Sequence, residues 1–247
     1  MLPLVRTILE NLVQSTRPSG KVGRPHSDTD DVLTCIDLVL RTGMPWRYLQ
    51  HTKCVTHWST AHRLFRKWTD EKLFEIAYKK LLKLRKRRPR RYCIDSSFVK
   101  NQYGIDCLGR NPTDRGRKAT KMSAIVDDEG VPISIVYFPA NTSDFCTVEQ
   151  TLEECMVTLQ KGIPLYADKG YDSEKNRELL QKRGLIDRIA KRKTRTHRVV
   201  NAKRTIVENF FAFHDKCRRL IMRFDALIAS YASFTFIFAC DLIVKRL

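Results

Sequence analysis

The spacing of the apolar residues changes once along the chain, close to Arg91, and this change constrains the fold more than any other feature. Before Arg91 the apolar side chains recur every three or four residues, as they do on one face of an α-helix. After Arg91, short apolar runs bounded by turn residues alternate with helical segments. The sequence therefore predicts a helical module followed by a mixed α/β domain.

Three helices are predicted in the first part of the chain. The first begins at Ser27, a candidate cap, and Gly43 ends it; the second covers 56–70 and the third 73–84. Three short helices with tight connections and many basic residues resemble a helix-turn-helix module, and the three tryptophans suit its core better than base stacking. We therefore predict a DNA-binding module over residues 1–84.

A run of basic residues follows this module. Seven of the nine residues from 83 to 91 are Lys or Arg. Such a run is usually solvated, but here it joins two domains, so it could also lie along a phosphate backbone or act as a nuclear address. We predict a linker over residues 85–91.

The remaining residues, 92–247, are predicted to form the second domain, a mixed sheet flanked by helices. The predicted strands are 92–94, 121–126, 133–138, 164–167 and 185–189, and the predicted helices include 147–159 and 173–183. The second and third strands are close enough to form a hairpin. Strands separated by a helix are expected to be parallel.

The chain is strongly basic. Lys and Arg number 46 against 27 Asp and Glu, which gives a formal charge of +19 and a pI near 9.8. Dense positive charge favours binding to nucleic acid, because neutralising phosphates releases counterions. A basic ribosome-associated protein would share this composition. Double-stranded DNA is the expected partner.

The cysteines and the apolar runs bear on the compartment. The eight cysteines form no Cys-x-x-Cys pair, which is typical of reduced thiols in an intracellular protein. The spacing of His51, Cys54 and His57 matches no usual zinc site. The 15 uncharged residues between Asp225 and Asp241 are too few to cross a bilayer and are typical of a buried helix. No membrane association is expected.

Three carboxylates stand out by their positions. Asp95 and Asp168 each end a predicted strand, and Glu208 lies near the start of a predicted helix. Transfer of a phosphodiester needs an activated oxygen and stabilisation of the leaving oxygen, and two divalent ions roughly 4 Å apart supply both. Carboxylates suit Mg²⁺ or Mn²⁺. By position alone, the three acids could equally be a turn cap, a loop residue and a surface ion pair.

Several segments in order carry a resemblance to one family. They are Gly-Arg-Pro at 23–25, Leu-Arg-Thr-Gly-Met-Pro-Trp-Arg-Tyr-Leu at 40–49, Trp-Ser-Thr at 58–60, Phe-Arg-Lys-Trp at 65–68, Ile-Asp-Ser-Ser at 94–97, Asn-Pro-Thr-Asp-Arg-Gly-Arg-Lys-Ala-Thr-Lys at 111–121, Ala-Asp-Lys-Gly-Tyr-Asp-Ser at 167–173, Val-Glu-Asn-Phe-Phe-Ala-Phe at 207–213, Cys-Arg-Arg-Leu at 217–220 and Met-Arg-Phe-Asp at 222–225. Together they resemble DDE transposases of bacterial insertion sequences, of the insertion-sequence-five-like group within the insertion-sequence-four-like superfamily.

That resemblance implies a ribonuclease-H-like catalytic core in which Asp95, Asp168 and Glu208 hold two Mg²⁺ or Mn²⁺ ions. It also implies cleavage and strand transfer at the ends of a mobile element. Arg204 and Glu208 match the family's Arg-x-x-x-Glu element, whereas Asn201 stands where the family often has Tyr. This departure concerns the grip on flanking DNA and leaves the metal ligands in place.

The resemblance and the charge pattern together nominate residues that contact DNA. They are Arg115, Lys121, Lys169, Arg204, Lys216, Arg192 and Lys193, the last two from a basic stretch at 188–198. Asp172 is a candidate helix cap or supporting acid. The implied partners are the terminal inverted repeats and the target DNA, bound by a homodimer. The expected location is on intracellular DNA, in the nucleoid of a prokaryote or the nucleus of a eukaryotic cell.

Two other functions fit the same residues. A ribonuclease-H-like nuclease would use the same acids without joining DNA. A catalytically idle protein descended from a transposase would only bind DNA, through residues 23–84. Retention of all three acids argues against the second function.

Overall fold

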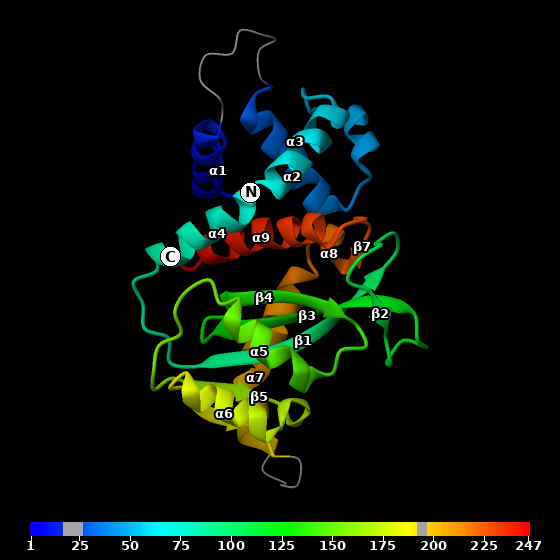
Figure 1. The fold of residues 1–247 in the computed structure, drawn as a ribbon. Helices are drawn as coiled ribbons and strands as arrows, with labels where there is room; N and C mark the ends of the chain where they lie inside the picture. The colour runs from blue at the N-terminus through cyan, green and yellow to red at the C-terminus, as the bar shows by residue number, and fades with distance from the viewer. Residues whose placement is uncertain (17–26, 192–196) are drawn as a thin grey trace. The chain divides into compact units, whose positions relative to one another are not determined.

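The computed structural model describes residues 1–16, 27–191 and 197–247, and of residues 197–204 it describes the backbone alone. The chain divides into two compact units (Figure 1), one formed by Met1–Leu84 with His214–Leu247 and the other by Arg85–Phe213. The sequence also places the end of the helical module at residue 84. The expected second domain, residues 92–247, differs from the observed second unit, because His214–Leu247 group with the N-terminal helices.

The first unit is helical. Its elements are α1 (Pro3–Ser15), α2 (Thr29–Thr42), the 3-10 helix η1 (Trp46–His51), α3 (Trp58–Asp70), α4 (Leu73–Leu84), α8 (Arg218–Ile221), the short strand β7 (Met222–Arg223) and α9 (Ile228–Val244). The three predicted helices are confirmed. Asp28, and not Ser27, caps α2 by accepting a hydrogen bond from the Asp30 N–H, and Gly43 ends α2 with φ of +71°.

Helix α9 explains why the C-terminal segment belongs to this unit. Its side chains are buried on nearly every side, as predicted for the uncharged run before Asp241, and it packs against α1, α3 and α4. Phe234 of α9 stacks on Phe65 of α3 with ring centroids 4.5 Å apart, and Trp46 lies 5.3 Å from Phe65. Within the described part of the chain, no helix has both the length and the apolar character to cross a lipid bilayer.

The second unit contains a mixed sheet with helices. Its elements are β1 (Tyr92–Asn101), β2 (Gly109–Arg110), β3 (Lys118–Asp127), β4 (Pro132–Pro139), α5 (Asp144–Glu153), β5 (Pro164–Ala167), the 3-10 helix η2 (Lys169–Tyr171), α6 (Glu174–Lys182), β6 (Ile186–Ile189) and α7 (His197–His214). All five predicted strands are present. Helix α5 ends at Glu153, earlier than the predicted residue 159.

The strand order gives the fold class. Strand β3 pairs antiparallel with both β1 and β4, while β1 pairs parallel with β5 and β5 pairs parallel with β6. The order β4-β3-β1-β5-β6, with β2 added beside β3, is a ribonuclease-H-like mixed sheet. The predicted hairpin is β3–β4, and the parallel pairs occur where a helix intervenes, since a parallel connection needs a crossover.

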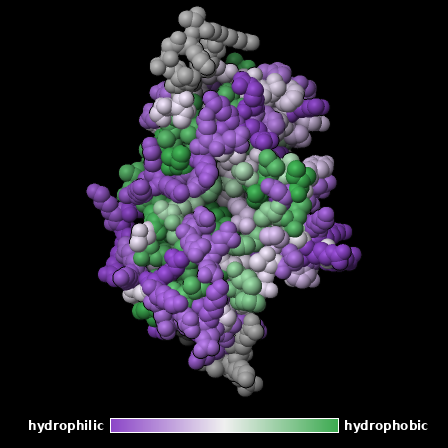
Figure 2. All heavy atoms as spheres, viewed as in Figure 1, coloured by the Kyte–Doolittle hydropathy of each residue, from purple (hydrophilic) through white to green (hydrophobic). Residues whose placement is uncertain are grey.

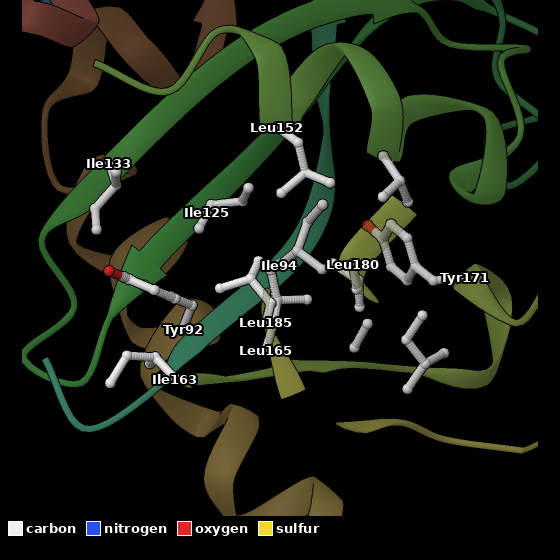
Figure 3. Close-up of a cluster of buried hydrophobic side chains, with 13 residues drawn as sticks. Tyr92, Ile94, Ile125, Ile133, Leu152, Ile163, Leu165, Tyr171, Leu180 and Leu185 are labelled. Carbon is white, nitrogen blue, oxygen red and sulfur yellow. The ribbon is translucent and has the colours of Figure 1, made fainter. Parts of the chain in front are cut away.

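The core of this unit lies between the sheet and helices α5 and α6 (Figure 3). Ile94 of β1, Leu165 of β5, Leu152 of α5 and Leu180 of α6 are each at most 1% exposed within one apolar cluster. Ser173, the first residue of the predicted helix 173–183, caps α6 by accepting a hydrogen bond from the Asn176 N–H.

Strand β1 differs from the prediction, which ended it at Asp95. The strand continues to Asn101, and the added residues pair with β3, Asp95 lying opposite Ala124 and Lys100 opposite Ala119. The polar residues after Ile94 look like a turn in sequence. Long-range pairing with β3 keeps them extended, because each backbone group finds its partner across the strands.

The basic linker is bound to the turn between β3 and β4. Arg85 Nη1 lies 2.5 Å from an Asp127 carboxylate oxygen, and Arg85 also contacts Glu129. Arg87 Nη2 lies 2.7 Å from the carboxylate of Asp128. Two of the linker arginines are therefore neutralised within the protein. The exposed charges of the linker, residues 85–91, are those of Lys86, Arg88 and Arg90.

The ion pair between Arg85 and Asp127 predicts a large difference between adjacent substitutions. Their side chains are 9% and 4% exposed, so Arg85→Gln leaves a buried carboxylate without its nearest cation, with only Arg87 Nη1 at 4.0 Å, and should destabilise the unit by about 3 kcal/mol. Lys86→Gln removes an exposed charge and should cost less than about 0.5 kcal/mol. Urea unfolding followed by circular dichroism measures both, and equal stabilities would contradict the docked linker.

Candidate active site

The two candidate aspartates are brought together by the register of two parallel strands. Tyr92 pairs with Leu165 and Cys93 with Tyr166, so paired positions differ by 73 (165 minus 92). Asp95 and Asp168 also differ by 73 (168 minus 95). Continuing this register therefore places the two aspartates side by side, at the strand separation of about 4.8 Å.

The alternation of side chains puts both aspartates on one face of the sheet. Ile94 and Ala167 precede them and belong to the apolar cluster that faces α5 and α6. Successive strand residues point to opposite faces, so Asp95 points away from that cluster, and the same is expected of Asp168, which directly follows the last residue of β5. In Figure 1, α7 passes behind the sheet.

Local hydrogen bonds orient the carboxylates. Asp95 Oδ1 accepts the Ser96 N–H at 2.9 Å, and Asp168 Oδ1 accepts the Gly170 N–H at 2.6 Å as the cap of η2. Gly170 has no room for a side chain: an added Cβ would lie 2.8 Å from Asp168 Oδ1 and 3.2 Å from Asp144 Oδ2. The glycine therefore lets a second acid, Asp144, approach Asp168.

Asp144 is a component of the site that the sequence did not single out. Its Oδ1 accepts hydrogen bonds from Ser96 Oγ at 2.8 Å and from Lys121 Nζ at 2.7 Å. Lys121 Nζ also donates to the Thr142 carbonyl oxygen at 2.5 Å. This network ties the start of α5 to β1 and β3 next to the aspartates. No short sequence signal reveals it, because its members lie on three separate segments.

Tyr171 lies beneath these acids. It is fully buried at the end of the apolar cluster opposite Tyr92 (Figure 3), and its hydroxyl lies near Ser96 without meeting the geometry of a hydrogen bond. Burial raises the pKa of Tyr171 well above its ordinary value, and the negative charges of Asp95, Asp144 and Asp168 raise the pKa further. The phenol therefore stays protonated and adds no charge to the site.

Glu208 lies on α7, where it is exposed between the buried residues Val207 and Phe210. Across residues 1–16, 27–191 and 197–247, no three His, Cys, Asp or Glu side chains lie close enough together to hold one ion. The register of β1 and β5, continued past their last paired residues, thus points to a pair formed by Asp95 and Asp168. The structure does not gather Glu208 with them into a ready-made three-ligand cluster.

The candidate DNA contacts fall into different environments. Arg115, Lys169 and Lys216 are exposed. Arg204 lies on α7, where only the backbone is described, and Arg192 and Lys193 lie outside the described residues. Asp172 pairs with Arg177 at 2.7 Å, and Ser173 takes the capping role suggested for Asp172.

The assignment of Lys121 to DNA contact is a correction. Its side chain is 5% exposed, and its ammonium group is held by Asp144 and Thr142. A phosphate cannot approach an ammonium group that is buried and already hydrogen-bonded. Lys121 instead supports the candidate site from within.

Comparison with known proteins decides the family. The family model described as "Transposase DDE domain" matches residues 86–240, well over half of the chain. The chain belongs to the DDE transposase family. A second model, described as "Putative transposase of IS4/5 family", matches residues 7–77. The resemblance to insertion-sequence transposases is confirmed.

One curated relative agrees with this assignment. The protein described as "Putative transposase for insertion sequence element IS402", from Burkholderia cepacia, is 32% identical over 158 residues, which cover 61% of this chain and 73% of the relative. The matched region of the DDE transposase family model contains Asp95, Asp168 and Glu208.

Solved transposase structures are more distant. A piggyBac synaptic complex with hairpin DNA matches at a TM-score of 0.41 and 11% identity, covering 80% of this chain and 49% of that one. A Mos1 strand transfer complex matches at 0.39 and 12%, covering 96% and 81%. The chain thus spans about half the length of the piggyBac transposase. The fold of this transposase is established by its strand order and its family.

The buried position of Lys121 predicts how its removal acts. Lys121→Met should lower the free energy of unfolding by about 2 kcal/mol, because the carboxylate of Asp144 loses a charged hydrogen bond. The double variant Lys121→Met/Asp144→Asn should recover part of that loss. Neither change should alter the salt dependence of DNA binding. Chemical unfolding measures the stabilities, and a titration at several salt concentrations measures DNA binding. A weaker salt dependence in the Lys121→Met variant than in the wild type would show that Lys121 contacts DNA.

Proposed function

We propose that this transposase cuts and joins DNA at the ends of a mobile element, with Asp95, Asp168 and Glu208 holding two Mg²⁺ or Mn²⁺ ions. The observation that supports the proposal is the register of β1 and β5, whose offset of 73 equals the separation of Asp95 and Asp168, in a chain of the DDE transposase family. Paired carboxylates provide the hard oxygen ligands that these ions prefer.

The two ions would activate the attacking oxygen and stabilise the leaving oxygen of the phosphodiester. Neighbouring residues would hold the two aspartates in place before the ions bind. Hydrogen bonds from the Ser96 and Gly170 N–H groups orient Asp95 and Asp168. The ammonium group of Lys121 compensates Asp144, so this nearby acid adds less negative charge to the pair.

Glu208 is proposed as the third ligand. Its exposed position on α7 leaves its carboxylate accessible to an ion, while the buried Val207 and Phe210 anchor the helix on either side. DNA phosphates and water would complete the coordination. Because the three acids are not gathered in advance, Glu208 would join the site as ions and DNA bind.

DNA binding is proposed for both units. Arg115, Lys169 and Lys216 present exposed cations, and Arg204, Arg192 and Lys193 are retained as proposed phosphate contacts. The helical residues 1–84 are proposed to recognise the terminal repeats. Lys86, Arg88 and Arg90 remain exposed in the linker segment for phosphate binding.

The active complex is proposed to be a homodimer acting on intracellular DNA. An element has two ends, and a twofold symmetric pair of protomers provides one active site for each.

The decisive experiment incubates the purified full chain with Mg²⁺ and DNA that carries the ends of its own element. We expect strand cleavage at the ends and products joined to a target duplex. Cleavage without joined products would instead identify a nuclease. Binding without any reaction, with either Mg²⁺ or Mn²⁺, would identify a protein that only binds DNA.

The proposed role of Glu208 predicts a separation of binding from chemistry. Glu208→Gln keeps the size of the side chain but removes the charge that holds a metal, so cleavage should be lost while DNA affinity and melting temperature stay close to wild type. Glu178→Gln changes another exposed helical glutamate and serves as the matched control. Cleavage by the Glu208 variant at the rate of the control would disprove the role.

The charge of the chain predicts a steep salt dependence of binding. Each neutralised phosphate contributes roughly 0.9 to the slope of log affinity against log salt. Removing the exposed linker charges with Lys86→Gln and Arg90→Gln should reduce that slope, whereas Arg85→Gln should not, because Arg85 is already paired with Asp127. Titrations at several salt concentrations measure the slopes. Binding that does not respond to salt would contradict the phosphate contacts.

A further inference from the structure

A short arm extends from the sheet of the second unit between β1 and β3. We define the β1–β3 arm as residues 100–118, which contain the end of β1, both connecting turns and β2. At its base, Ala119 of β3 pairs with Lys100 on one side and with Gly109 on the other. Thr120 Oγ1 also donates to the Cys107 carbonyl oxygen at 2.9 Å. The arm is therefore anchored to the sheet at several points.

An asparagine side chain closes each turn of the arm. In the first turn, the Asn101 amide accepts the Gly104 N–H at 2.8 Å and donates to the Gly104 carbonyl oxygen at 3.2 Å. In the second, Asn111 Oδ1 accepts the Thr113 N–H at 2.9 Å, and the Asn111 N–H donates to the Arg117 carbonyl oxygen at 2.9 Å. The arm's shape is fixed by its own hydrogen bonds before any partner binds.

These closed turns display apolar side chains to solvent. Tyr103 is 63% exposed and Ile105 is 74% exposed, although both belong to an anchored segment. Exposing large apolar side chains on an ordered turn forgoes the free energy of burial, which is typical of a surface that binds a partner.

The same arm displays a set of cations. Its exposed basic residues are Lys100, Arg110, Arg115, Arg117 and Lys118. The two acids of the arm, Asp106 and Asp114, are only partly exposed. Arg115 and Gly116 have φ values of +50° and +70°, so a tight left-handed turn presents Arg115 and Arg117.

We propose that the β1–β3 arm is a groove-binding element for duplex DNA, with its cations on the phosphates and with Tyr103 and Ile105 against sugars and base edges. Cations beside apolar side chains match a DNA groove, which is lined by phosphates at its edges and by less polar sugars and bases within. A second copy of the arm carries the same positive charge and would be repelled.

The position of the arm deepens the proposed function, on which this part of the inference rests. Asn101 lies six residues after Asp95 in β1, a distance of about 20 Å along an extended strand. At 3.4 Å per base pair, this places the arm contact about six base pairs from the scissile phosphate. The arm would therefore fix the register of the DNA relative to the aspartates.

The test compares two arm variants with a matched control in the full chain. Tyr103→Ala/Ile105→Ala removes the apolar contact, and Arg115→Gln/Arg117→Gln removes two charges. Lys161→Gln/Lys182→Gln removes two exposed charges elsewhere in the same unit. The probe is a fluorescently labelled random-sequence duplex in EDTA, so binding is measured without any reaction. Melting temperatures verify that each variant folds.

The two arm variants should differ in kind. The apolar variant should lower affinity by about tenfold at fixed salt, comparable to the loss of one stacking contact, and leave the salt slope unchanged. The arginine variant should flatten the slope by roughly 1.8, which corresponds to two phosphates. The control should change the slope by less than half of that. On a second duplex that carries the end of the element, hydroxyl-radical protection about six base pairs from the cleavage position should weaken in both arm variants and persist in the control.

Other outcomes overturn the proposal. Arm variants that bind DNA like the control would show that the arm does not contact it. Unchanged DNA binding with an altered mass in sedimentation would assign the arm to contact between copies. The wild-type chain could also fail to cut or join DNA while the arm variants still bind DNA more weakly than the control. That result would support the DNA-binding role of the arm and refute the proposed function. A wild-type chain that does not bind DNA would refute both.

Discussion

The parallel pairing of β1 with β5 is the interaction on which the rest of the second unit depends. One register sets Tyr92 beside Leu165 and Cys93 beside Tyr166, and the same offset sets Asp95 beside Asp168. A slip of either strand by one residue would turn that strand's aspartate toward the apolar cluster, because side chains alternate between the faces of a sheet. The apolar residues that bury Ile94 and Leu165 therefore also fix the carboxylates. Core packing and the candidate site are consequences of a single register.

A hydrogen-bonded network next to the acid pair contains both an acid, Asp144, and the lysine that compensates its charge, Lys121. Asp144 approaches the pair across Gly170, and Lys121 and Ser96 hold it there. A buried lysine is costly unless it is paired, and here Lys121 donates to the Asp144 carboxylate and to the Thr142 carbonyl oxygen. The arrangement keeps a third acid beside Asp95 and Asp168 with much of its charge compensated. It also links the beginning of α5 to the two central strands.

The net charge of +19 overstates the charge available to DNA. Arg85 is paired with the β3–β4 turn, Lys121 is buried, and Arg219 forms a buried ion pair with Asp225 at 2.7 Å. Arg223 is fully buried and donates to the Asp225 and Ala226 carbonyl oxygens. On the face drawn in Figure 2, hydrophilic and apolar side chains both occur on the right, where β2 lies in Figure 1. The positions of the exposed cations therefore indicate DNA-binding surfaces better than the net charge does.

The sequence by itself determined the order and type of most elements, the end of the third predicted helix at residue 84 and the family, since each follows from local periodicity, turn residues or short motifs. It also nominated Asp95 and Asp168, whose separation of 73 matches the strand register. Tertiary structure alone decided that β1 continues past Asp95, that α9 packs with the N-terminal helices, that Arg85 and Lys121 serve the fold, and that Asp144 joins the acid pair. These features depend on contacts between residues far apart in the chain. Burying a charge or pairing a strand edge becomes favourable only when the partner residue, which is distant in sequence, is in contact with it.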